Sequence, residues 1–160
     1  MFREIAGLPG HVLVIHAAVA LVPLLALLSA AYGVLPRWRP RLGWAVGILA
    51  VVTPIVTFVA TQSGEALEQV LREKGYPADI LDQVREHAEY GDTLLWFTLG
   101  LAVAALLLLA LTSDHPRVPR LPSWIVPVLT VVVIVLAGAA LVYVYLTGDS
   151  GAQAVWGTTL

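Results

Sequence analysis

Four long apolar stretches alternate with short polar ones along the chain. Each has roughly 20 residues, the length that a helix needs to cross the hydrocarbon core of a bilayer. They run from about Val12 to Val34, Leu42 to Thr61, Thr93 to Thr112 and Trp124 to Leu146, and none has Lys, Arg, Asp or Glu in its middle. This pattern predicts an all-α, polytopic membrane protein built as a four-helix bundle.

A charged connector separates the second and third spans. It runs from Ser63 to Glu86 and carries six acidic residues against Arg72, Lys74 and Arg85. Gly75-Tyr-Pro77 divides it into two segments, in each of which apolar residues recur at helical spacing. We expect these segments to form a short amphipathic helical cap that lies on the membrane surface over one end of the bundle.

The two halves of the chain resemble each other. His11 and His16 open the first span as His87 and Asp92 open the third, and Ser-Gly pairs follow spans two and four. Two spans per repeat bring both copies into the membrane in the same sense, which predicts parallel repeats about an axis along the membrane normal. The expected organisation is one membrane domain, 1–160, with repeat one at 8–70, repeat two at 84–157 and an exoplasmic connector at 63–86.

Arginines in the short turns predict the orientation. The turn between spans one and two holds Arg37, Arg39 and Arg41, and the turn between spans three and four holds Arg117 and Arg120. Positive residues favour the cytoplasmic side, so both termini and the acidic connector are expected outside. The start of the chain lacks the pattern of a cleaved signal peptide, and the expected location is the bacterial cytoplasmic (inner) membrane.

Composition narrows the classes of function. Apolar residues make up 59% of the chain and charged ones 12%, with a mean hydropathy of +0.85, so the lipid bilayer is its first expected partner. The absence of cysteine excludes disulfides, iron–sulfur clusters and thiol chemistry. A net charge of -2 without a basic patch argues against nucleic acid. No hydrolase or phosphate-loop motif is present, so an electron carrier or accessory subunit is favoured over a stand-alone enzyme.

Under this topology, histidines and carboxylates gather on the outer side, while His115 lies in a cytoplasmic turn. Ionisable groups at a membrane boundary are costly unless paired or ligated, so each is a functional candidate. The predicted cofactor-binding residues are His11, His16, His87, Gly64 and Gly151. The predicted metal ligands are His11, His16, His87, Glu65 and Asp92, with Glu89 as a further carboxylate.

Spacing favours ligands from different helices. His11 and His16 are five residues apart, about 140° around a regular helix, so they diverge. His11 with His87, or His16 with Asp92, could instead meet across the bundle. Two opposed imidazoles suit haem b, whereas imidazoles with a carboxylate suit zinc, copper or non-haem iron.

Each candidate also has a structural interpretation. His16 could hydrogen-bond to Asp92, His11 could cap its helix, and His87 could be solvated among acids. Gly64 and Gly151 are typical of helix stops, although glycine also lets backbone approach a planar cofactor.

The opening Gly7-Leu-Pro-Gly-His11-Val-Leu-Val-Ile-His16 resembles that of the bacterial membrane family known as domain of unknown function 2231, whose first span begins Gly-Leu-Pro-x-His-Pro-x-x-Val-His-Phe-Pro. The chain departs from it at Val12 and Ala18, where the prolines would fall. Later motifs of the family are resembled by 61–64, His87 and 147–151, so the resemblance covers nearly the whole chain. Some members are joined to Rieske-type iron–sulfur domains, which implies electron transfer near the outer face, here with a separate redox partner.

Three functions remain open at this stage. The leading hypothesis is a protein that binds haem b or a transition metal through outer-side histidines and exchanges electrons with a partner. The second is a non-catalytic accessory or scaffold subunit whose histidines only hydrogen-bond across the bundle. The third is a small transporter or proton-linked channel that uses His16 and Asp92 as a relay, although spans two and four lack a deep ionisable residue. Homo-oligomerisation is left open.

Overall fold

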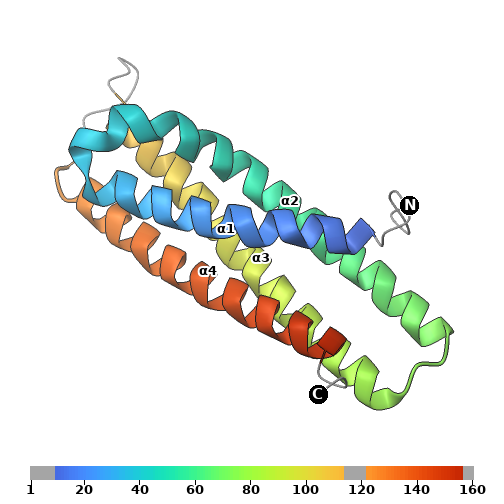
Figure 1. Cartoon of the computed structure of the whole chain (residues 1–160). Coiled ribbons are helices and arrows are strands. Elements are labelled where there is room, and N and C mark those ends of the chain that lie inside the picture. Colours follow the sequence, from blue (N-terminus) through green and yellow to red (C-terminus); the bar gives the residue numbers. More distant parts are fainter. Residues whose placement is uncertain (1–9, 114–121, 157–160) are drawn as a thin grey trace.

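A computed structural model describes residues 10–113 and 122–156. This part of the chain forms four helices, α1 (Gly10–Val34), α2 (Arg39–Glu73), α3 (Ala78–Thr112) and α4 (Ile125–Trp156), with a single 3₁₀ turn, η1 (Pro36–Trp38), after α1. The helices run up and down in one elongated bundle (Figure 1). The predicted all-α four-helix architecture is confirmed.

The four helices stand at the corners of a square. Each helix packs against its two neighbours, α1 and α3 against both α2 and α4, while α1 and α3 face each other across a diagonal. A pseudo-twofold axis along the bundle would relate α1 to α3 and α2 to α4, and this arrangement allows it. The duplication itself stays a prediction.

The bundle is apolar inside and outside. Val22, Leu25, Leu101 and Val133 are completely buried between the helices. Yet Trp96 on the outer surface is 73% exposed, and many Val, Leu and Ile side chains accompany it. All four helices are long and apolar enough to cross a membrane, with mean hydropathies of 2.2 to 2.9 in their spanning windows. Lipid therefore supplies the missing contacts, and the chain is a multi-pass membrane protein.

The connector differs from the expected cap. Its two segments are helical, as predicted, but they continue α2 and α3, which have 35 residues each, about 50 Å. Figure 1 shows that the α2–α3 turn lies farther out than the start of α1 and the end of α4. This turn and the helical segments on either side of it, residues 65–92, are called the α2–α3 arm from here on.

The predicted helix stops at Gly64 and Gly151 are wrong. Both glycines lie inside helices, because neither has to reverse the chain and the packing against neighbouring helices continues past them. The reversal occurs instead at Gly75, which has a φ of 70°, a left-handed conformation that glycine adopts without strain. The division of the connector at Gly75-Tyr-Pro77 was predicted correctly.

At the opposite end of the bundle, Arg39 closes α1. Its guanidinium donates to the carbonyls of Tyr32 (3.2 Å) and Gly33 (3.3 Å), which the helix leaves without amide partners. The Tyr32 hydroxyl meets Thr112 Oγ1 at 2.7 Å and so joins α1 to α3. The other predicted cytoplasmic residues, Arg117, Arg120 and His115, lie outside the described residues.

Helix α1 approaches α4 closely at Gly33. A Cβ built on Gly33 would lie 2.8 Å from Thr130 Cγ2, whereas one built on Gly138 of α4 would have no neighbour within 4 Å. Threonine is β-branched and stiff, so Thr130 cannot turn aside cheaply. Small residues of this kind allow helix backbones to come close inside lipid.

We predict that Gly33→Ala lowers the free energy of unfolding in detergent by about 1–2 kcal/mol, because overpacking forces α1 and α4 apart. Gly138→Ala, the control, should stay within about 0.5 kcal/mol of the wild type or stabilise it, since alanine is the better helix former. Thr130→Ser removes the clashing methyl group and should rescue Gly33→Ala. Denaturant unfolding followed by circular dichroism measures all four proteins, and equal effects of the two glycine substitutions would contradict the close approach.

Candidate functional site

Among the predicted site residues, His87 makes the clearest contacts with a neighbouring helix. It lies on α3 in the α2–α3 arm, half-buried against the last turns of α4. Its Nδ1 is 3.0 Å from Ser150 Oγ, and Ser150 donates its hydroxyl proton to the Thr147 carbonyl at 3.2 Å. A hydroxyl has one proton, so the direction of the His87–Ser150 bond depends on which ring nitrogen of His87 carries the proton. The hydrogen bond links α3 to α4 through two residues that are 63 positions apart in the sequence.

Gly151 makes room for the imidazole ring. A Cβ at this position would lie 3.0 Å from His87 Cε1 and 3.3 Å from Nδ1. The ring therefore rests on the bare backbone of α4 while Ser150 binds its edge. We call His87, Thr147, Ser150 and Gly151 the His87 seat.

The predicted role of Gly151 in receiving a planar cofactor does not fit this geometry. The flat group that covers Gly151 is the imidazole of His87 itself. A porphyrin could not occupy the same surface without displacing the ring. Gly64, its counterpart in the sequence, lies half-buried within α2.

The other predicted ligands come from three helices. His16 on α1, Glu65 on α2, and Glu89 and Asp92 on α3 are all exposed. Glu65 accepts a hydrogen bond from Gln62 Nε2 at 3.3 Å. His11 belongs to α1, but its side chain lies outside the described residues.

These positions do not make a metal centre by themselves. Within residues whose side chains are described, no three His, Asp or Glu groups converge so as to hold an ion. The reason is helical geometry, since Asp92 follows His87 by five residues and is turned about 140° away from α4. The described side chains therefore do not fit a three-ligand metal site.

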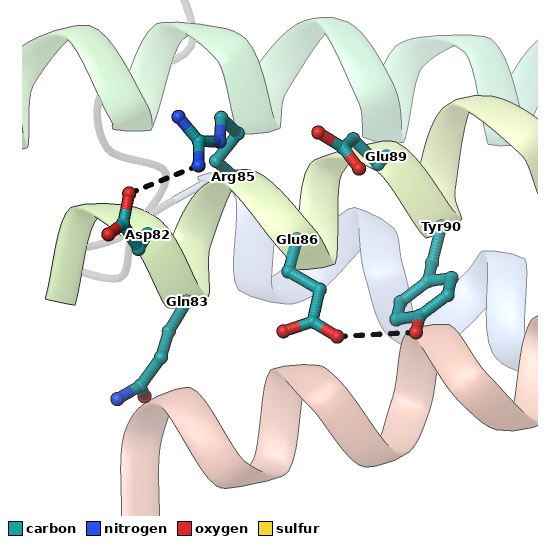
Figure 2. Close-up of a pocket in the computed structure, with 6 residues that line it drawn as sticks. All are labelled: Asp82, Gln83, Arg85, Glu86, Glu89 and Tyr90. Carbon is teal, nitrogen blue, oxygen red and sulfur yellow. Dashed lines mark hydrogen bonds and ion pairs between the residues drawn. The ribbon is translucent and has the colours of Figure 1, made fainter. Parts of the chain in front are cut away.

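A polar hollow lies beside the seat on the outward face of α3 (Figure 2). Arg85 pairs with Asp82 at 3.2 Å, and the Tyr90 hydroxyl donates to Glu86 Oε1 at 3.2 Å. Gln83 points toward α4 in the same view. Ion pairs this exposed contribute little to stability, which leaves the charges available for contacts with another molecule.

A narrower groove of about 120 Å³ runs between α3 and α4 to Ser150. It is lined by Gln83, Glu86, Tyr90, Leu146, Asp149, Ser150 and Gln153. Sequence reasoning missed most of these residues. Their only signal was spacing, because Gln83, Glu86 and Tyr90 recur three and four residues apart and so share one face of a helix.

A comparison with known protein families agrees with the four-helix membrane fold. The sequence model of domain of unknown function 2231, described as a predicted membrane protein, matches residues 7–160. The chain belongs to this family. Searches among curated proteins and among solved structures give no significant match. The predicted resemblance to domain of unknown function 2231 is thus confirmed over nearly the whole chain, and the family description agrees with four membrane helices.

We predict that alanine substitutions at two glycines of α4 change the free energy of unfolding by different amounts, because only one of these glycines lies in the His87 seat. Gly151→Ala should lower the free energy of unfolding by about 1 kcal/mol, because the new methyl group pushes His87 away from Ser150 and weakens their hydrogen bond. Gly148→Ala is the control, since a Cβ there meets nothing within 4 Å. Thermal unfolding in detergent compares the two, and the downfield ring N–H signal of His87 should be lost only in Gly151→Ala. Indistinguishable variants would show that the ring does not rest on α4.

Proposed function

We propose that this protein is a non-catalytic accessory or scaffold subunit of a membrane assembly. The observation that carries the proposal is the 3.0 Å bond from His87 to Ser150, which uses the histidine to join α3 to α4. A histidine in this role fixes the shape of the arm outside the apolar spans. A rigid, charged projection on a membrane bundle is suited to binding another protein.

The charge of the α2–α3 arm supports a basic partner. Residues 65–92 contain eight acidic residues against three basic ones, and two of the basic ones, Arg72 and Arg85, already pair with acids of their own helices. The outward carboxylates Glu86 and Glu89 remain exposed. Complementary charge steers association and sets specificity more than affinity.

Charge reversal tests the scaffold proposal. The tagged protein, extracted from its own membranes in mild detergent, should migrate with a partner as a complex larger than itself. Glu86→Lys with Glu89→Lys should weaken that complex at least about tenfold, and added salt should do the same to the wild type. Asp114→Lys, which follows α3 in the sequence outside the arm, serves as the control. A wild-type protein that migrates alone, or a complex that is indifferent to the double reversal, would refute the proposal.

Binding of haem b or of a copper, zinc or iron ion, with electron transfer to a partner on the outer face, is the second candidate. It is supported by the hydrogen bond between His87 Nδ1 and Ser150. Histidines that bind metals through Nε2 usually have Nδ1 held by such a hydrogen bond. The expected ligands are His87 with His11 from α1, together with His16, Glu65 or Asp92. The chemistry supplied would be one-electron exchange by the bound group.

A visible spectrum and elemental analysis of the purified protein distinguish the two candidates. The scaffold proposal expects no Soret band and less than stoichiometric metal, whereas the cofactor proposal expects one or the other. If a cofactor is found, His87→Ala should abolish its binding while His115→Ala should not. Binding that survives His87→Ala would exclude the seat as the site.

The proposed orientation has both termini and the arm outside the bacterial cytoplasmic membrane. The arginine cluster at the α1–α2 turn supports it, since Arg37, Arg39 and Arg41 stand there without an acidic residue in 34–44. Alkaline phosphatase, which is active only outside, should be active when fused after Gly75 and inactive when fused after Pro36. The reverse result would invert the orientation.

A further inference from the structure

Hydroxyl groups inside the helices follow one rule with three exceptions. Most serines and threonines of the described helices donate to a carbonyl of their own helix three or four residues earlier; they are Thr57, Thr61, Ser63, Thr93, Thr112, Thr130, Thr147 and Ser150. In contrast, Ser29, Thr53 and Thr98 are at most 1% exposed, and their hydroxyl oxygens have no hydrogen-bond partner among the described residues.

Two glycines establish how α2 and α3 are aligned. The two helices are antiparallel neighbours. A Cβ on Gly91 would lie 3.9 Å from Thr61 Cγ2, and near the other end of the pair a Cβ on Gly43 would lie 3.5 Å from Leu109 Cδ2. Both contacts imply the same register.

This register brings Thr53 and Thr98 to one level of the bundle. Thr98 lies seven residues beyond Gly91, and Thr53 lies eight residues before Thr61. At a rise of about 1.5 Å per residue these steps differ by only about one residue. Both threonines are 0% exposed, so both face the interior between the spans. Ser29 belongs to α1 and is not part of this pair.

Pro54 removes an amide donor at this level. Proline has no amide hydrogen, so it cannot donate to the carbonyl of Ala50, four residues earlier in α2. Ala50, Thr53 and Pro54 are all buried, which places them on the same interior face of the helix. Two hydroxyl groups and a carbonyl oxygen thus lie within about one helical turn of each other along the bundle, at a depth where lipid offers no partner.

We propose that a water molecule is bound between α2 and α3, held by Thr53 Oγ1, Thr98 Oγ1 and the Ala50 carbonyl. Buried waters typically make about three hydrogen bonds to groups that lack other partners, and this site offers that number. The ligand is neutral, because the described spans carry no charged side chain at this depth to balance an ion. Leu94 and Leu101, one turn to either side of Thr98 on α3, are buried and border the site.

Radiolytic footprinting tests the site on the intact protein in detergent. Brief X-ray irradiation produces hydroxyl radicals from bound water, which oxidise adjacent side chains, and mass spectrometry locates the oxidised residues. Leu94 and Leu101 should oxidise several-fold faster than Leu108, which is equally buried and lies ten residues beyond Thr98 on the same helix. Equal rates for the three leucines in the wild type would overturn the proposal without the need for a variant.

Valine substitutions give the matched comparison, because valine keeps the shape of threonine and removes its hydroxyl. Thr53→Val with Thr98→Val should reduce oxidation of Leu94 and Leu101 to the rate of Leu108. Thr57→Val, one turn away on α2, removes a hydroxyl that is satisfied by the Thr53 carbonyl and should leave the rates unchanged. Oxidation that persists in the folded double variant, or that falls equally in Thr57→Val, would refute a water held by these two threonines.

Discussion

Inside lipid, every polar group must find its partner within the protein, and this requirement shapes the whole bundle. Helices satisfy their backbone groups internally, which is why the described chain is almost entirely helical. Most serines and threonines of the described helices meet the same requirement by donating to carbonyls of their own helix. At Pro54, where a proline removes an amide from the interior of α2, two unpartnered threonines lie at the same level, and the proposed water satisfies them.

Polar groups are satisfied in different ways at the two ends of the bundle. At the arginine-bearing end, Arg39 donates to the last carbonyls of α1, so a charged side chain completes the helix where the apolar region stops. At the other end, α2 and α3 simply continue beyond the apolar spans, with polar and acidic residues on their surfaces. The His87 seat lies on this continuation, where α4 is still long enough to accompany α3. The seat can form because α3 and α4 both continue beyond their apolar spans.

The positions of the candidate ligands favour one proposed function over the other. Metal and haem centres in helical bundles need ligands from facing helices that point to one spot. Here the exposed carboxylates Glu65 and Asp92 turn outward, and His87 is already held by Ser150 and covers Gly151. A structural histidine on a charged arm accounts for these features with fewer changes than a cofactor site does. The scaffold proposal is therefore the first, and the cofactor proposal the second.

The sequence by itself determined the membrane class, the number of helices, the family and the break at Gly75, because apolar length and a left-handed glycine are local properties. It also identified His87 and Ser150-Gly151 as notable, but it could not show that they meet. Only the tertiary structure decided that the connector extends α2 and α3, that Gly64 and Gly151 do not end their helices, and that Thr53 lies level with Thr98. These outcomes depend on which helix faces which and in what register. Side chains far apart in the sequence, such as Tyr32 and Thr112, which are 80 positions apart, set that register through packing.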